Sequence, residues 1–168
     1  MPKIIENLQQ RLVSEARKQI VELGYGAMTI RSVAEGCGVG VGTVYNYFSS
    51  KDHLVAAFML EDWEKCISAI NAVSEHSDAP LPVLKSIFEQ IGSYARMHET
   101  LFSDKAAASA FSGVFSVYHA LLRSQLAQPL LKFCSDSFSA EFIAEALLTW
   151  TLAGKDFDAI YPIIEKLF

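Results

Sequence analysis

The residues best suited to chemistry in this sequence gather in one short segment, and their chemistry is that of binding. They are two phenols, a threonine hydroxyl, an asparagine amide and one lysine: Thr43, Tyr45, Asn46, Tyr47 and Lys51. Phenols and hydroxyls hydrogen-bond to phosphate oxygens, whereas amide and methyl groups contact base edges. Residues 36–51 contain no acid, so the segment carries no charge that would repel a phosphate.

Two short helices with glycines between them are expected to position these side chains. Residues 30–37 have apolar side chains at helical spacing, and Thr29 can cap that helix. A second helix over about residues 40–48 would turn Val44 and Phe48 toward the core. Gly42 and the polar residues would then occupy the opposite arc, where glycine permits a close approach of the backbone to DNA. This pattern predicts a helix-turn-helix, although the tyrosines of an ordinary all-α protein could instead pack on the next helix.

The rest of the chain also has helical periodicity, and the predicted fold class is all-α. Further helices are expected over about residues 8–23, 51–73, 83–98, 105–128 and 140–153, with a last segment from residue 156. Residues 75–82 form the clearest loop, a break is expected near residues 100–104, and residues 130–138 are ambiguous. Ser139 is the expected cap of the helix over 140–153.

Composition excludes several classes of protein. Apolar residues make up 51% of the 168 residues and charged residues 20%, which argues against intrinsic disorder. No run of about 20 apolar residues could span a membrane, and the N-terminus does not resemble a signal peptide, so a cytoplasmic protein is expected. Three distant cysteines and four scattered histidines predict neither a disulfide nor a metal site. With no catalytic triad or phosphate loop either, we expect no enzyme and no cofactor.

The net charge of −5 hides an asymmetry along the chain. Residues 1–53 hold six Lys or Arg against five acids, a net charge of +1. Residues 54–168 hold eight basic and fourteen acidic residues, a net charge of −6. The acidic average therefore belongs to the C-terminal part and does not exclude an N-terminal nucleic-acid-binding segment.

A family resemblance joins the turn, the second helix and the following lysine. Residues 29–54 read TIRSVAEGCGVGVGTVYNYFSSKDHL, which closely resembles the DNA-binding region of the TetR family of bacterial transcriptional regulators. The family pattern is roughly T-h-x-x-h-A-x-x-x-G-V-x-x-G-T-h-Y-x-[YH]-F-x-[SN]-K-x-x-L, where h is apolar. The resemblance implies a three-helix helix-turn-helix DNA-binding domain over residues 1–52 and a helical effector-binding and dimerisation domain over residues 53–168.

The resemblance also implies a function and roles for single residues. The chain would be a homodimeric repressor on a palindromic double-stranded DNA operator, released by a small-molecule effector. Thr29 and Lys51 would touch phosphate, and Val41 and Gly42 would lie closest to base edges. Thr43, Tyr45 and Tyr47 would be contacts on the recognition helix, with Asn46 at a position that varies in the family. The alternative is a helical ligand-binding or protein-interaction module without DNA binding.

The C-terminal half offers candidates for the dimer interface and for the effector pocket. Its last two helices are rich in apolar residues, and those expected at the interface are Phe142, Ile143, Leu147, Trp150, Ile160 and Ile164. A pocket for a small apolar or aromatic effector would use aromatic side chains with a few polar groups. The candidates are Trp63, Phe88, Tyr94, Phe111, Phe115, Tyr118 and His119, which could equally fill a helical core.

Overall fold

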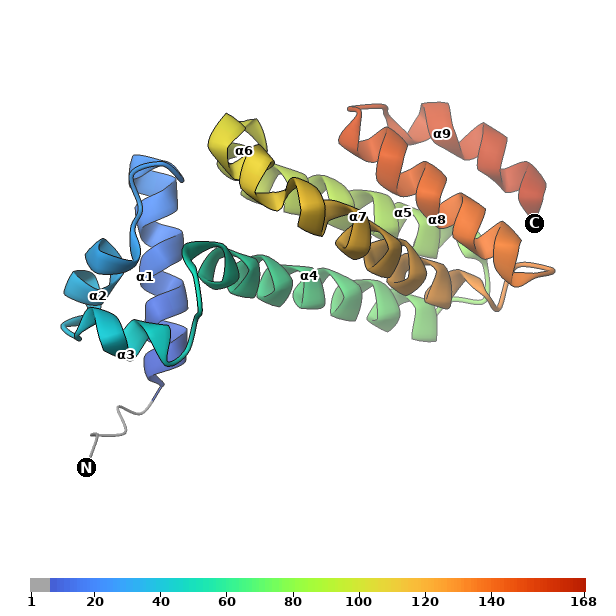
Figure 1. Cartoon of the computed structure of the whole chain (residues 1–168). Helices are drawn as coiled ribbons and strands as arrows, with labels where there is room; N and C mark the ends of the chain where they lie inside the picture. The colour runs from blue at the N-terminus through green and yellow to red at the C-terminus, as the bar shows by residue number, and fades with distance from the viewer. Residues whose placement is uncertain (1–6) are drawn as a thin grey trace. The chain divides into compact units, whose positions relative to one another are not determined.

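The computed structural model describes residues 7–168, apart from the side chains of residues 108 and 110–117, and this described part is helical without strands (Figure 1). The predicted all-α class is therefore confirmed. In chain order the helices are α1 (Leu8–Leu23), α2 (Ile30–Cys37), α3 (Val41–Tyr45), α4 (Lys51–Glu75), α5 (Pro80–Met97), α6 (Glu99–Ser103), α7 (Lys105–Ala127), α8 (Ser137–Leu152) and α9 (Phe157–Ile164), with 3₁₀ turns at Gln128–Leu130 and Glu165–Leu167.

Several helix ends differ from the sequence-based expectation. Helix α3 ends at Tyr45 instead of Phe48. Helix α5 begins at Pro80, because a proline fits the first turn of a helix, so the predicted loop is shorter. The expected break near residues 100–104 holds the short helix α6, and α8 is capped by the carboxylate of Asp136 and not by Ser139.

Contacts divide the chain into two compact units, each with its own apolar core. Unit 1 contains the chain up to Asp62 and residues 98–112, and unit 2 contains residues 63–97 and 113–168. Helices α4 and α7 therefore contribute residues to both units. The predicted domain boundary between residues 52 and 53 divides a DNA-binding role from an effector-binding and dimerisation role. This division stays a prediction.

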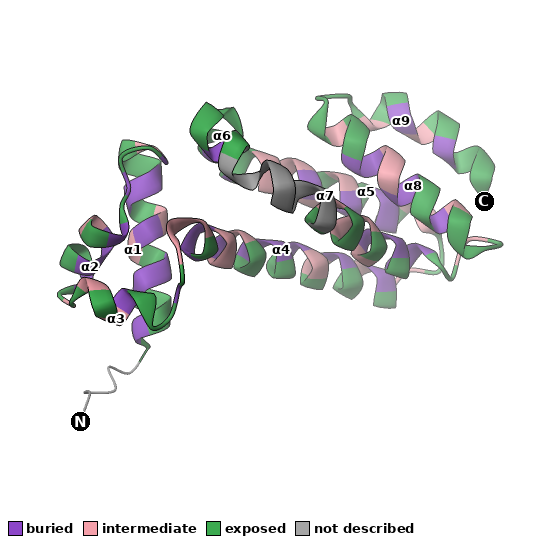
Figure 2. Cartoon of the chain, in the orientation of Figure 1, coloured by how far each residue is buried: buried purple, intermediate pink, exposed green. Residues whose placement is uncertain are grey.

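The core of unit 1 forms where α1, α2, α3 and the start of α4 turn their apolar side chains toward one another. Leu12, Ala16 and Val33 are among its fully buried members, and buried residues recur along α1 in Figure 2. Helix α6 adds Leu101 to the same core.

The core of unit 2 forms mainly between α5 and α8, where Leu84, Ile87 and Leu147 are fully buried. A lysine from the segment before α8 fixes the end of α4, because Lys132 Nζ donates to the backbone oxygen of Ser77 at 2.7 Å and also to that of Ser74. Among the described residues, no helix has the length and apolar character needed to cross a bilayer.

Candidate nucleic-acid interface

The start of α2 is fixed by reciprocal hydrogen bonds between Thr29 and Ser32. Thr29 Oγ1 accepts from the backbone N–H of Ser32 at 3.0 Å, and Ser32 Oγ accepts from the backbone N–H of Thr29 at 3.0 Å. This capping box satisfies two amide groups that the first turn of a helix leaves without partners. Thr29 caps α2 as predicted, and its side chain lies at the exposed end of that helix.

Helix α1 holds α2 at two points along its length. The buried Gln19 donates from Nε2 to the backbone oxygen of Ser32 at 3.1 Å and accepts from Ser32 Oγ at 2.5 Å. Arg11 Nη2 donates to the backbone oxygen of Cys37, the last residue of α2, at 2.9 Å. The following Gly38 has φ 68°, a conformation that favours glycine, and it begins the turn toward α3.

Along α3 and the turn after it, buried and exposed side chains fall on opposite faces, as the helical spacing predicts. Val44 and Phe48 are buried, whereas Tyr45 is 53% exposed and Tyr47 43% exposed. Asn46 is also exposed, although it lies after the end of α3.

Three further predicted contact residues complete this surface. Gly42 is exposed, and a Cβ atom added there would meet nothing within 4 Å. Val41 and Thr43 are half-buried. The exposed arc therefore consists of a bare stretch of backbone, two phenols and an amide, which is a surface able to contact phosphates and base edges.

Lys51 lies at the start of α4, but its ammonium group is bonded inside unit 1. Nζ donates to the backbone oxygen of Tyr25 and lies 3.9 Å from the centre of the Tyr25 ring. The Tyr25 hydroxyl in turn donates to Asp52 Oδ1. Burial lowers the pKa of Lys51, while the charge of Asp52 acts in the opposite direction. Sequence reasoning did not identify Tyr25 as part of the site, since 26 residues separate it from Lys51 and no local pattern joins them.

Among the described effector candidates, Trp63, Phe88 and Tyr94 lie in or against the core of unit 2, and an effector role for the set stays a prediction. Trp63 is buried and donates from Nε1 to Gln125 Oε1 at 2.7 Å, and the Tyr94 ring packs edge-on against it at 5.4 Å. Phe88 instead pairs with Phe157 of α9 at 5.5 Å. Two more candidates lie on α7, where Tyr118 is exposed and His119 Nε2 lies 3.5 Å from Glu145 Oε1. The side chains of Phe111 and Phe115 lie outside the described residues.

The predicted dimer residues divide into core and surface. Ile143, Leu147, Ile160 and Ile164 are all at most 5% exposed and belong to the core of unit 2, and their place at a dimer interface stays a prediction. Phe142 and Trp150 are about half exposed. Other exposed apolar side chains on α8 and α9 that the prediction omitted are Phe138, Leu152 and Ile163.

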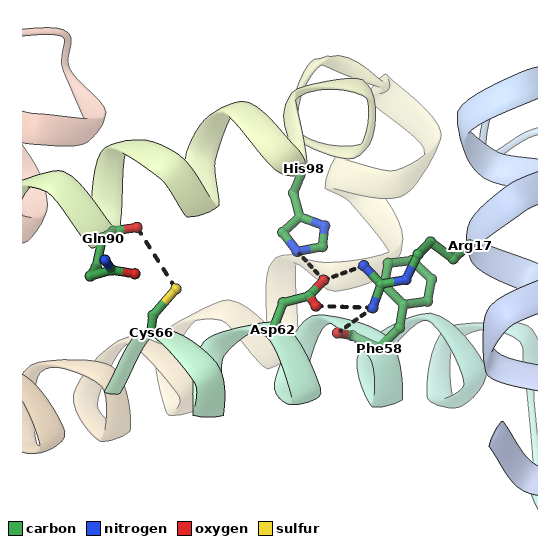
Figure 3. A network of polar contacts seen from close by, with 6 residues as sticks. All are labelled: Arg17, Phe58, Asp62, Cys66, Gln90 and His98. Atoms are coloured by element: carbon green, nitrogen blue, oxygen red, sulfur yellow. Dashed lines mark hydrogen bonds and ion pairs between the residues drawn. The ribbon is translucent and has the colours of Figure 1, made fainter. Parts of the chain in front are cut away.

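Unit 1 contains a buried polar network that no sequence pattern predicts (Figure 3). Asp62, which is 3% exposed, binds both terminal nitrogens of Arg17 from α1, with Oδ1 3.0 Å from Nη2. His98, also 3% exposed, places Nε2 3.2 Å from Asp62 Oδ2. The Phe58 ring stacks on the His98 ring at 5.8 Å and lies 5.0 Å from the Arg17 guanidinium. Figure 3 also shows the separate contact of unit 2 between Cys66 Sγ and the backbone oxygen of Gln90, at 3.8 Å.

A capped and braced helix, a glycine turn and a short helix with an exposed polar arc define the helix-turn-helix class of protein. Residues 12–58 match the sequence model of the family described as bacterial regulatory proteins, tetR family. The N-terminal part of the chain thus matches the DNA-binding region of this family, as the resemblance of residues 29–54 predicts.

Two relatives match the same N-terminal part of the chain. The chain is 35% identical over 68 residues to the HTH-type transcriptional repressor KstR of Rhodococcus jostii (strain RHA1), covering 36% of this chain and 32% of that protein. It is 29% identical over 58 residues to the HTH-type transcriptional regulator UidR of Escherichia coli (strain K12), covering 34% and 30%. The matched region thus spans about a third of the length of these curated relatives.

Solved structures share the fold over nearly the whole chain. The putative transcriptional regulator SCO7518 from Streptomyces coelicolor A3(2) gives a TM-score of 0.71 at 14% identity, covering 96% of this chain and 98% of the other. FadR of Thermus thermophilus, a TetR-family repressor solved in complex with lauroyl-CoA, gives 0.65 at 17% identity, covering 95% and 92%.

Proposed function

We propose that this protein is a DNA-binding transcriptional regulator of the bacterial cytoplasm, a homodimeric repressor that a small apolar or aromatic effector releases from a palindromic operator. The observation that carries the proposal is the exposed arc of Gly42, Tyr45, Asn46 and Tyr47 on and just after α3, a helix that packs on α2, which α1 in turn holds in place. No acid interrupts residues 36–51, so the arc can approach a polyanion without repulsion.

The DNA contacts divide into two kinds. Phosphates would be bound by the hydroxyls of Tyr45 and Tyr47, by Thr29 at the start of α2 and by Lys51. Base edges would be met by Val41, Gly42, Thr43 and Asn46, the side chains on and just after α3. Phosphate contacts set affinity and base contacts set sequence preference, so substitutions in the two groups should have different effects.

Dimerisation follows from the geometry of DNA. A palindromic operator needs two recognition helices about 34 Å apart on one face of the duplex, and two-fold symmetry supplies that arrangement. The exposed side chains Phe138, Phe142 and Trp150 of α8 and Ile163 of α9 offer an apolar surface for a second copy.

Helix α4 supports the proposed response to an effector. It begins at Lys51 and contributes residues to both units, so a shift at its C-terminal part would reach the residues at its start. A coupling free energy of about 1–3 kcal/mol would lower operator affinity fivefold to more than a hundredfold. The effector need only bind better to the conformation with lower DNA affinity.

Selection of bound sequences from a random pool of double-stranded DNA tests the proposal. We expect the full chain to enrich a palindrome whose half-sites lie about one helical turn apart. Tyr47→Ala and Lys51→Ala should weaken binding to that DNA without loss of helicity, and Lys51→Ala should reduce the salt slope by about one unit per subunit. Lys85→Ala removes an exposed charge on α5 and serves as the matched control with unchanged binding. Failure to enrich any sequence would favour a helical ligand-binding or interaction module.

A further inference from the structure

Tyr25 contacts two oppositely charged residues at the start of α4, and it does so with different atoms. Its backbone oxygen accepts from Lys51 Nζ, and its ring lies beneath the same ammonium, 3.9 Å from Nζ to the ring centre. Its hydroxyl donates to Asp52 Oδ1. Burial and the neighbouring carboxylate hold the pKa of Tyr25 well above its usual range, so the hydroxyl keeps its proton and remains a donor.

Neighbouring charges of opposite sign are a problem on a surface that binds phosphate. A carboxylate next to the ammonium repels the phosphate and also competes with it for the ammonium. The charge of Asp52 already acts on Lys51, whose pKa it raises against the effect of burial. Tyr25 is only 6% exposed and Asp52 is half-buried, and the hydrogen bond holds the Asp52 carboxylate at the Tyr25 hydroxyl.

We propose that Tyr25 is a positioning residue for DNA binding, because it keeps the Asp52 carboxylate away from the Lys51 ammonium and holds that ammonium at the start of α4. The proposal rests on the proposed function, in which Lys51 binds a phosphate. An ammonium group has three N–H donors, so the bond to the Tyr25 carbonyl does not use up its capacity. Lys51 can therefore stay in place and bind a phosphate oxygen as well.

A second acid, Asp104, bears on the same cluster through its charge, which acts on both Tyr25 and Lys51. Its Oδ1 accepts from the backbone N–H groups of Ala106 and Ala107, at 2.8 and 3.1 Å, and this caps α7. The Asp104 carboxylate is thus fixed by helix amides, whereas the Asp52 carboxylate is fixed by Tyr25.

The test is a double-mutant cycle of Tyr25→Phe and Asp52→Asn. Phenylalanine keeps the ring and the backbone carbonyl and removes only the hydroxyl. We expect Tyr25→Phe to lower affinity for operator DNA by about threefold to tenfold, because the released carboxylate pairs with Lys51. The slope of log affinity against log salt should become shallower by up to about one unit per subunit. In the Asp52→Asn background, Tyr25→Phe should change affinity less than about twofold.

Fluorescence anisotropy over a series of salt concentrations measures both quantities, with the selected operator as the labelled DNA. Tyr161→Phe is the matched control, because Tyr161 also bonds a carboxylate, that of Glu165, but lies in unit 2 on α9. It should leave DNA affinity and salt slope unchanged. Thermal unfolding of each variant reports any loss of folded protein.

Two results would overturn the inference while the proposed function stands. One is a wild-type protein that binds DNA, with Lys51→Ala weakened and Tyr25→Phe unchanged. The other is an equal loss from Tyr25→Phe in both backgrounds, which would indicate a packing role for the hydroxyl. If the wild-type chain binds no DNA, or if Lys51→Ala binds as the wild type does, the phosphate-binding role assigned to Lys51 fails first.

Discussion

Asp62 is a buried carboxylate that contacts residues from different parts of unit 1, among them Arg17 and His98. Arg17 lies on α1, and His98 lies between α5 and α6. Burying a carboxylate is costly unless hydrogen bonds and opposite charge replace its water, and here the guanidinium meets both carboxylate oxygens. The network thus joins α1, α4 and the start of α6, and removing one partner should cost more than the worth of an exposed ion pair.

We predict that Asp62→Ala lowers the free energy of unfolding by about 2–3 kcal/mol, because it leaves the Arg17 charge and the buried His98 without the carboxylate. Urea denaturation followed by circular dichroism measures the change. Arg123→Ala is the control, since Arg123 pairs with Glu141 and Glu145 at distances of 4.0 and 3.6 Å near the surface. Its effect should stay below about 1 kcal/mol, and equal losses in the two variants would contradict the special role of burial.

We also predict that His98 makes stability depend on pH. Burial lowers the pKa of His98, with the Arg17 charge acting in the same direction and Asp62 opposing it. The folded state therefore binds a proton less readily than the unfolded state, whose histidine titrates near pH 6.5. The stability contribution is complete above that value and is lost as the pH falls below it.

Urea denaturation between pH 7.5 and 5 compares the wild type with His98→Gln, which keeps a donor toward Asp62. The wild type should lose more stability over this range than the variant, because only the wild type carries the buried imidazole. Parallel curves for the two proteins would show that His98 is not the group responsible.

Residue contacts could be predicted from the sequence only where they are local. The division of residues 44–48 into buried Val44 and Phe48 and exposed Tyr45 and Tyr47 follows from helical spacing, and the structure confirms it. The Arg17–Asp62 pair joins residues 45 positions apart, and nothing in the spacing of either residue indicates the other. Such pairs arise when helices pack, which is why a buried aspartate on α4 had no sequence signal.

At the scale of the element, α3 spans only five residues and includes Gly42. A Cβ atom at Gly42 would meet nothing within 4 Å, so a substitution there can affect stability and DNA binding in opposite directions. We predict that Gly42→Ala stabilises the protein by about 0.5–1 kcal/mol, because alanine is the better helix former and meets no neighbour. The same methyl group should lower operator affinity about tenfold or more, because it stands between the backbone and the base edges. Thermal unfolding and DNA-binding titrations measure the two effects.

Gly38→Ala is the matched control for this prediction. Gly38 has φ 68°, so alanine there should cost about 1–2 kcal/mol of stability although the space around it is open. If Gly42→Ala leaves DNA binding intact, the close backbone approach assigned to α3 is wrong.

Helix ends were less predictable than helix interiors, and the reasons are local competition between residues. Pro80 and Pro82 suggest a loop by type, yet both fit the first turn of α5. Asp136 and Ser139 can both cap a helix, and the structure uses Asp136, whose Oδ1 accepts from the backbone N–H of Ser139 at 2.8 Å. That bond also lowers the pKa of Asp136.

At the scale of the whole molecule, the surplus of apolar residues predicts an interface but does not locate it. Ile143 and Leu147 fill the core of unit 2, whereas Phe138 and Phe142, with ring centroids 6.4 Å apart, lie exposed on α8. Hydrophobicity alone cannot separate these cases, because core and interface use the same side chains. Exposure in the folded chain makes the distinction.

We predict that Phe142→Glu converts the proposed dimer to a monomer, because it places a charge in the apolar part of the proposed interface. Sedimentation velocity measures the mass, and circular dichroism should show unchanged helicity. Val21→Glu is the control, since Val21 is 69% exposed on α1, outside the proposed interface. A wild-type protein that sediments as a monomer would remove the interface from the proposal.

The two tryptophans lie in contrasting surroundings, and this gives the protein two built-in optical reporters. Trp63 is buried and bonded to Gln125, whereas Trp150 is 49% exposed on α8. Dissolved iodide should quench the emission of Trp150 and spare that of Trp63. Association through α8 would shield Trp150 from iodide, and a molecule bound beside Trp63 would change the shorter-wavelength emission. Single Trp→Phe variants would therefore report the two events one at a time, because Trp63→Phe leaves Trp150 to follow subunit assembly and Trp150→Phe leaves Trp63 to follow effector binding.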